Sequence, residues 1–164
     1  MYNLLGSHDT PRVLTLLGDR ERVVRALAIE YLIYGAPSVY YGDEVGMEGG
    51  PDPDNRRPMV WSPDRWDLEL VNTVRLFNRL RSKEPAMRWG LFAARPYTSD
   101  GVLLARWWGG DAILALVSRS RVPALSLPRV SCDVLAQRGV GESYVDGFLV
   151  LKCRRAALAS FSFS

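Results

Sequence analysis

The first 41 residues follow the order strand, helix, strand, and this pattern restricts the fold more than any other feature of the sequence. A short apolar run at 2–5 is broken by Gly6-Ser7, an amphipathic segment covers 20–34, and a second apolar run covers 37–41. Strands joined in this way lie parallel and are connected by a right-handed crossover. Two parallel strands cannot close a barrel and leave sheet edges open. The pattern therefore predicts one part of a larger α/β sheet.

Two helices are predicted from apolar residues that recur every three or four positions. The first, over 20–34, has Asp19 as its N-cap and stops at Gly35. The second covers 68–83 and is limited by Pro85. The apolar faces comprise Val23, Val24, Leu27, Ala28, Tyr31 and Leu32 in the first helix, and Leu70, Val74, Phe77 and Leu80 in the second.

The pattern changes after Trp89. Short apolar runs then occupy 91–96, 102–108, 112–117 and 148–152, separated by Ser-Asp-Gly, Gly-Gly-Asp and Val-Asp-Gly. Turn-forming residues between such runs are typical of antiparallel strands. The sequence therefore predicts an α/β domain over 1–86, followed by an all-β domain over 87–164.

A long polar segment at 43–67 joins the second predicted strand to the second helix. It is rich in Gly, Pro, Asp and Arg, and loops of this length are either functional or disordered. Met47, Met59, Trp61 and Trp66 are apolar side chains that a disordered loop would not retain. We therefore expect an ordered, packed loop.

Composition argues against several classes of protein. The net charge is +3 and the basic residues are spread along the chain, so no nucleic-acid partner is expected. No apolar run reaches the ~18 residues of a membrane span, and the N-terminus does not resemble a signal peptide. Cys132 and Cys153 fit no metal-ligand spacing and are interpreted as two reduced thiols in a cytoplasmic protein. We expect neither a metal nor a cofactor.

His8 and Asp9 follow the first predicted strand directly. The carboxyl end of a parallel strand is where α/β barrels place their active sites, so both side chains are candidates for function. His8 is the chain's one histidine, which rules out a metal cluster or relay built on a second histidine. By itself the dipeptide is weak evidence, because Asp9 would be unremarkable as an N-cap or as an ion-pair partner of Arg12.

A second stretch adds specificity: Gly35-Ala-Pro-Ser-Val-Tyr-Tyr-Gly-Asp-Glu-Val-Gly-Met47, followed by Gly49-Gly-Pro-Asp-Pro-Asp-Asn-Arg-Arg-Pro-Met-Val-Trp61. Together with Asn3–Arg12 it resembles the α-amylase family of glycoside hydrolases, in the neopullulanase, cyclomaltodextrinase and maltogenic amylase branch. The resemblance covers about the first 120 residues. It implies the last βαβα portion of a TIM (β/α)8 barrel, strands seven and eight, followed by the antiparallel β-sandwich called domain C.

The resemblance also implies roles for single residues. Asp9 matches the carboxylate that stabilises the transition state, and His8 matches a histidine that binds the sugar ring at the cleaved bond. Hydrogen bonds to ring hydroxyls strengthen as the sugar becomes oxocarbenium-like. Asp52 and Arg56 match positions that contact a sugar further along the glucan.

For other residues in these stretches a structural role is the stronger interpretation. Arg12, Asp43, Glu44 and Arg57 are of the kind that forms carboxylate–guanidinium pairs and holds long barrel loops in place. Trp61 is left open between a core residue and a platform on which a sugar stacks.

The family's nucleophile and general acid have no counterpart in this sequence. A retaining glycosidase needs these two carboxylates about 5–5.5 Å apart, and the family takes them from strands four and five. We therefore expect a C-terminal fragment of a retaining α-glucan hydrolase or transglycosylase that is inactive alone.

Two alternatives remain open: a non-catalytic carbohydrate-binding or accessory protein derived from such an enzyme, and one half of a split enzyme. The expected partners are an α-glucan (maltodextrin, pullulan or cyclodextrin) and the remaining barrel portion, in cis or in trans. A homo-oligomer formed by swapping would also cover the open sheet.

Overall fold

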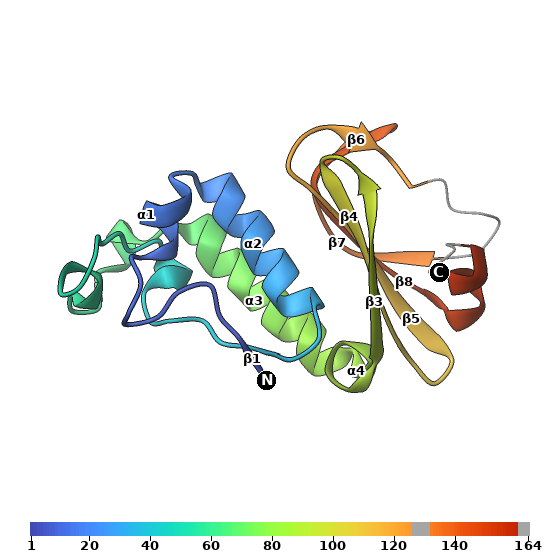
Figure 1. Cartoon of the computed structure of the whole chain (residues 1–164), viewed down its shortest axis with the longest axis horizontal. Coiled ribbons are helices and arrows are strands. Elements are labelled where there is room, and N and C mark those ends of the chain that lie inside the picture. Colours follow the sequence, from blue (N-terminus) through green and yellow to red (C-terminus); the bar gives the residue numbers. More distant parts are fainter. Residues whose placement is uncertain (126–131, 161–164) are drawn as a thin grey trace. The chain divides into compact units, whose positions relative to one another are not determined.

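The computed structural model describes residues 1–125 and 132–160 of the chain. These divide into two compact units, which are described separately (Figure 1). The first, here the helical unit, comprises Met1–Tyr31 and Gly35–Asn78. The second, here the sheet unit, comprises Leu32–Tyr34 and the chain from Arg79 onward. The domain boundary after residue 86 stays a prediction.

The helical unit contains the predicted parallel strand pair. β1 (Tyr2–Asn3) pairs in parallel with β2 (Ala36–Pro37), and α1 (Val13–Leu17) and α2 (Arg20–Leu32) connect them. The parallel pairing is confirmed, but both strands are shorter than predicted. The ladder ends at Ser38, whose N–H bonds to the Asn3 carbonyl, and the residues up to Tyr41 are not strand.

α2 begins where it was predicted and ends earlier. The Asp19 carboxylate accepts a hydrogen bond from the Glu21 N–H at 3.0 Å, as an N-cap does. The helix ends at Leu32, so the predicted extension to residue 34 was wrong. Gly35 has a left-handed φ of 121° and lies beyond the helix, where an added Cβ would meet the Asn3 side chain at 2.7 Å. Gly35 therefore permits the close approach of β2 to β1 rather than capping the helix.

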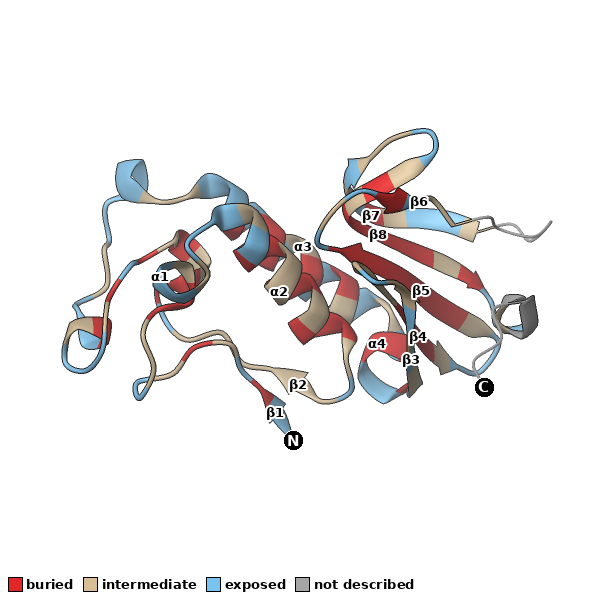
Figure 2. Cartoon of the chain, turned by 45° about the horizontal axis from the view of Figure 1, so that its top comes forward, coloured by how far each residue is buried: buried red, intermediate tan, exposed pale blue. Residues whose placement is uncertain are grey.

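α3 (Leu68–Lys83) has the predicted bounds and runs parallel to α2. Near their N-termini, Arg20 lies 3.5 Å from Asp67, which also caps α3. Near the other end of α2, the Tyr31 ring stacks on Phe77 with 5.5 Å between centroids. The predicted apolar residues of both helices are buried, as Figure 2 shows along α2 and α3. Parallel neighbouring helices are what successive β/α repeats on one sheet produce.

Glu30 is a buried acid on α2. Its carboxylate accepts a hydrogen bond from the Ser38 N–H at 3.0 Å, and its carbonyl accepts one from the Asn3 side chain at 3.4 Å. Burial raises the pKa of Glu30 to about 7, an effect that the Ser38 N–H opposes and nearby Asp43 increases. Glu30 thus connects α2 to both strands through a group that titrates near neutral pH.

The long loop after β2 is ordered, as predicted. It contains three short 3-10 turns, at Asp43–Val45, Asp54–Arg56 and Pro63–Arg65. Val45, Met47 and Val71 form a buried cluster against which Met59, Val60 and Trp66 pack. Trp61 does not take part, because 79% of it is exposed.

The sheet unit is antiparallel, as predicted, and its strands are connected by hydrogen bonds into one sheet. The strand order is β3-β4-β5-β8-β6, and β7 also pairs with β8. β8 pairs with β5, β6 and β7, and the packing of these strands as a sandwich stays a prediction. The bounds are β3 (Leu91–Thr98), β4 (Gly101–Trp108), β5 (Asp111–Ser118), β6 (Val122–Pro123), β7 (Cys132–Val140) and β8 (Tyr144–Arg154), with α4 (Pro85–Trp89) before them and a 3-10 turn (Arg155–Ser160) after them.

Two of the three predicted turns connect strands. Ser99-Asp100 joins β3 to β4, and Gly109-Gly110 joins β4 to β5, with Gly109 at a left-handed φ of 59°. The third was wrong, because Val145-Asp-Gly147 lies inside β8. The glycine that suggested a turn, Gly147, lies opposite a register irregularity in β7. Its N–H donates to the Ser118 hydroxyl at 3.1 Å.

Cys132 and Cys153 form a disulfide, which corrects the interpretation of two reduced thiols. The two residues are directly opposite each other in the β7–β8 ladder, with 4.4 Å between their Cα atoms. Strand β7 was not predicted, since its half-exposed sequence mixes polar and apolar residues without a clear period. Without β7 the sequence offers no sign that the two sulfurs meet.

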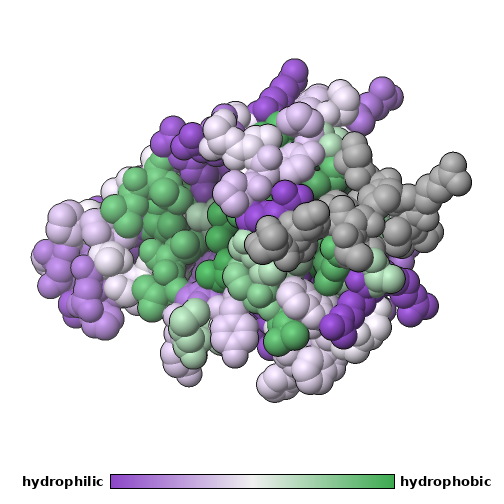
Figure 3. All heavy atoms as spheres, turned by 45° about the vertical axis from the view of Figure 1, so that its right-hand side comes forward, coloured by the Kyte–Doolittle hydropathy of each residue, from purple (hydrophilic) through white to green (hydrophobic). Residues whose placement is uncertain are grey.

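Apolar side chains also reach the surface (Figure 3). In the helical unit, Tyr2 of β1 and Leu4 just after it are exposed on either side of buried Asn3. Among the described residues no helix is both long and apolar enough to cross a membrane.

Removing the disulfide should destabilise the chain. It closes a loop with a sequence separation of 21, and its loss is expected to lower the free energy of unfolding by about 3 kcal/mol. Urea unfolding should show this for Cys132→Ala/Cys153→Ala, with no further effect of reductant on the variant. Two alkylatable thiols in the freshly purified, unreduced protein would contradict the assignment.

Glu30 should make stability depend on pH. Because its folded-state pKa is raised from 4.5 to about 7, the folded chain holds a proton that the unfolded chain releases, and stability falls as pH rises through this window. Glu30→Gln keeps the acceptor for the Ser38 N–H but removes the group that titrates. Between about pH 5 and pH 8, the free energy of unfolding of this variant should therefore fall by roughly 2 kcal/mol less than that of the wild type. Unfolding curves at both pH values test this, with exposed Glu142→Gln as the control. An equal loss of unfolding free energy between the two pH values in the wild type and in Glu30→Gln would refute this prediction.

Candidate functional site

The loop after β1 presents His8 and Asp9 to solvent. Their side chains are 62% and 71% exposed, and His8 Nε2 lies 3.3 Å from an Asp9 carboxylate oxygen. The backbone beneath them is a tight turn: the Ser7 hydroxyl accepts from the Asp9 N–H at 3.1 Å, and the Ser7 N–H donates to the Thr10 hydroxyl at 3.0 Å. Two exposed polar groups are thus held on a short, hydrogen-bonded loop.

Arg56 brings the second predicted pair to the same place. Its Nε lies 2.7 Å from an Asp52 carboxylate oxygen and donates to the His8 carbonyl at 3.2 Å. Its Nη2 lies 3.8 Å from an Asp9 carboxylate oxygen. Arg56 and Asp52 are about half-exposed, so the four sequence-predicted sugar-binding residues converge on one exposed surface.

Asn55 was not among the sequence-predicted site residues. It is fully buried, and its side-chain amide donates to the His8 carbonyl at 2.7 Å and to the Thr10 carbonyl at 2.9 Å. Its position between Asp54 and Arg56 in the motif was the available signal, but a neutral amide gives no hint of its partner.

Arg12 and Asp43 form a buried pair beneath this surface. Arg12 Nη1 lies 3.5 Å from an Asp43 carboxylate oxygen, and the side chains are 0% and 4% exposed. The guanidinium also donates to the Tyr41 carbonyl and lies 4.4 Å and 4.5 Å from the ring centroids of Tyr40 and Tyr41. Burial raises the pKa of Asp43 to about 6, against the opposing effect of Arg12.

The remaining candidates lie around the long loop. Arg57 pairs with Asp54 at 2.6 Å, and the Asp54 carboxylate also accepts from the Gly50 N–H at 2.6 Å. These two contacts, the backbone N–H foremost, lower the pKa of Asp54. Glu44 is half-buried, and one of its carboxylate oxygens has no hydrogen-bond partner among the described residues. The exposed Trp61 side chain is not a core residue of this unit.

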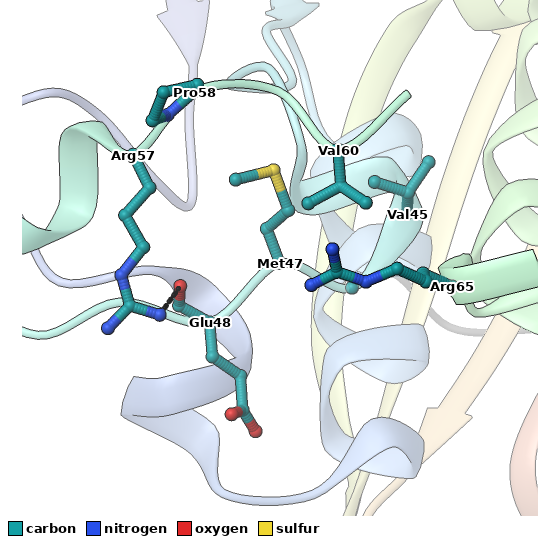
Figure 4. A pocket seen from close by; sticks show the side chains of 8 residues that line it. Val45, Met47, Glu48, Arg57, Pro58, Val60 and Arg65 are labelled. Carbon is teal, nitrogen blue, oxygen red and sulfur yellow. Dashed lines mark hydrogen bonds between the residues drawn. The ribbon is translucent and has the colours of Figure 1, made fainter. Parts of the chain in front are cut away.

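A cavity of about 440 Å³ lies on the same loop. In Figure 4, Met47 lies between Arg57 and Arg65, and Arg57 donates to the Glu48 carbonyl at 3.5 Å. The lining consists of Val45, Gly46, Met47, Glu48, Arg57, Pro58, Val60 and Arg65. None of His8, Asp9, Asp52 or Arg56 lines it, so the cavity and the predicted sugar-binding surface are separate features.

The arrangement offers hydrogen bonds rather than a reactive pair. Asp9 and Asp52 are both connected to Arg56, and carboxylates and a guanidinium on one exposed surface can accept from and donate to the hydroxyl groups of a polyol. Over residues 1–125 and 132–160, no three His, Cys, Asp or Glu side chains gather in a way that could hold a metal ion.

Comparison with known proteins agrees with this fold. Residues 1–68 match the family described as Alpha amylase, catalytic domain. A cyclomaltodextrinase from Geobacillus thermopakistaniensis (strain MAS1) is 40% identical over 126 residues, which are 75% of this chain and 21% of the relative. A maltogenic alpha-amylase from Bacillus acidopullulyticus is 46% identical over 87 residues, 52% of this chain and 15% of the relative.

A solved structure extends the similarity. The maltogenic amylase from S. marinus matches with a TM-score of 0.79 and 32% identity, over 91% of this chain and 22% of that one. The chain spans about a fifth of the length of this structure and of the cyclomaltodextrinase. With the catalytic-domain match, the named relatives and the fold in agreement, this chain belongs to the α-amylase family of glycoside hydrolases.

Proposed function

We propose that this chain supplies the sugar-contacting part of the active site of a retaining α-glucan hydrolase or transglycosylase, as the C-terminal portion of the enzyme. The convergence of His8, Asp9, Asp52 and Arg56 carries the proposal. These residues come from two loops more than forty positions apart, yet Arg56 reaches the other three within 3.8 Å. The substrate class is an α-glucan such as maltodextrin, pullulan or cyclodextrin, in line with the relatives' names.

In this proposal Asp9 acts where charge develops. The sugar at the cleaved bond becomes positively charged and flattened in the transition state, so a fixed carboxylate contacting its hydroxyls binds it more strongly than the ground state. His8, 3.3 Å away, contacts the same ring. Asp52 and Arg56, paired at 2.7 Å, contact a neighbouring sugar.

Bond cleavage also needs a nucleophile and a general acid about 5–5.5 Å apart. We propose that the remaining barrel strands provide both, in cis or in trans, and pack on β1 and β2. Exposed Tyr2 and Leu4 support this, because apolar side chains beside an open two-stranded sheet gain from being covered.

We propose a cytoplasmic location, and one structural feature argues against it. An intracellular maltogenic amylase from Bacillus subtilis is 39% identical to part of this chain, which supports the location. Disulfides, however, are rare in reducing compartments, and Cys132 and Cys153 are bonded here. The redox state of these two cysteines in cells is therefore the measurement that bears on the location.

The chain alone should bind a linear or cyclic α-glucan weakly. Arg56→Ala removes contacts with both loops and should weaken maltotriose or β-cyclodextrin binding by about tenfold or more, measured by isothermal titration calorimetry. The control is Arg119→Ala, which removes a surface pair with Asp100 in the sheet unit. Equal affinity of both variants and the wild type would remove Arg56 from the site.

Catalysis should appear only with the rest of the barrel. When the chain is joined to or mixed with a barrel portion carrying the two other carboxylates, reducing-sugar release is expected. Asp9→Asn should lower kcat by about 100-fold or more with little loss of stability, as expected for a preorganised electrostatic contact. Inactivity of a confirmed wild-type complex would reject the enzyme proposal, and near-normal turnover of Asp9→Asn would reject the role of Asp9.

A further inference from the structure

We propose that Asn55 is the positioning residue of this site, and that its two side-chain hydrogen bonds hold the His8–Asp9 turn in the geometry that contacts sugar. The inference rests on the proposed function and assigns the residue that keeps the two sugar-binding segments in register. Asn55 itself does not touch substrate, since it is completely buried.

The geometry of the two bonds explains why one side chain is sufficient. A carboxamide has two N–H donors, and Asn55 directs its nitrogen at the carbonyls of His8 (2.7 Å) and Thr10 (2.9 Å). These carbonyls flank Asp9 on either side in the chain. With both fixed, the backbone of Asp9 cannot rotate freely while its carboxylate stays exposed.

The rest of the loop contact directs Asn55 toward this turn. The Arg12 N–H donates to the Gly49 carbonyl at 2.9 Å, and the Gly49 N–H donates to the Thr15 hydroxyl at 2.9 Å. A Cβ added at Gly49 would lie 2.8 Å from the Asp54 carbonyl oxygen and 3.0 Å from the Asn55 Cα, so a glycine is needed there. The loop is thus held close behind the turn on which Asn55 acts.

Asn55 also links the two pairs of sugar-binding residues. The next residue, Arg56, donates to the same His8 carbonyl from the exposed side, at 3.2 Å. The His8 carbonyl therefore accepts from a buried amide and from an exposed guanidinium at once. Movement of either loop would break contacts that fix the other loop. The geometry of the site therefore depends on the buried hydrogen bond from Asn55 to the His8 carbonyl, which solvent cannot replace.

The test uses Asn55→Ala and Asn55→Asp in the whole chain. Asn55→Asp keeps the shape but removes both donors, which separates hydrogen bonding from packing. The matched control is Asn78→Ala, which removes a side-chain acceptor from the Tyr31 hydroxyl (2.9 Å) elsewhere in the helical unit. His8 is the only histidine, so its imidazole proton signals in NMR report on the turn without ambiguity.

Both Asn55 variants should shift or broaden the His8 imidazole signals and speed hydrogen exchange of the Asp9 and Thr10 amides about tenfold. Maltotriose affinity should fall about tenfold, equal to about 1.4 kcal/mol. Asn78→Ala should lower stability without either effect. Unchanged His8 signals and exchange in Asn55→Ala would overturn the proposal, whatever the sugar affinity.

Two further outcomes remain decisive. If the wild type binds no glucan, the proposal that this chain binds sugar is rejected. The hydrogen-exchange measurement still decides whether Asn55 positions the turn. If both Asn55 variants fail to fold, the wild-type side-chain amide protons of Asn55 are measured instead. Two distinct, slowly exchanging signals support the proposal, and rapid exchange as in a solvated amide rejects it.

Discussion

Burial of the Arg12 guanidinium is the constraint on which the helical unit's surface depends. A cation without solvent must be balanced, and Arg12 is surrounded by the Asp43 carboxylate, the Tyr41 carbonyl and two tyrosine rings. Gly42 has a left-handed φ of 88°, and an added Cβ would lie 3.3 Å from the same guanidinium. The chain therefore has to turn sharply next to Arg12, and the loop after β2 is held against the loop after β1. This arrangement gives exposed His8 and Arg56 a common, rigid base.

The site separates buried and exposed groups by task. Asn55 and Arg12 are buried. The Asn55 amide donates to two backbone carbonyls of the loop after β1, and Arg12 Nη1 donates to the Tyr41 carbonyl of the loop after β2. His8 and Asp9 keep their side chains in solvent, where a ligand can reach them. Hydrogen bonds are directional and fix the loop backbones, whereas apolar packing of Met47 and Val45 fixes only the distance between loop and helix. A surface that must present several polar groups in one geometry needs both.

Much of the architecture could be predicted from short-range patterns. The bounds of α3, the start of α2 and the Gly109-Gly110 turn follow from apolar periodicity, capping and turn chemistry, all of which act within a few residues. Strand β7 escaped prediction because its period is weak, and the disulfide escaped with it. The prediction of a turn at Val145–Gly147 was wrong because a glycine inside a strand and a glycine in a turn give the same local sequence pattern.

The sequence by itself determined the family, the α/β-to-all-β order and the residues that meet sugar in the proposed site, since these reside in local patterns and motifs. Only the tertiary structure decided which of them converge and what holds them. Asn55 bonds to His8 across 47 positions, and Cys132 faces Cys153 through strand register. The physical reason is that the partner of a hydrogen-bond donor, like the burial of Arg12, depends on how segments far apart in the sequence pack together. Local sequence patterns do not encode that packing.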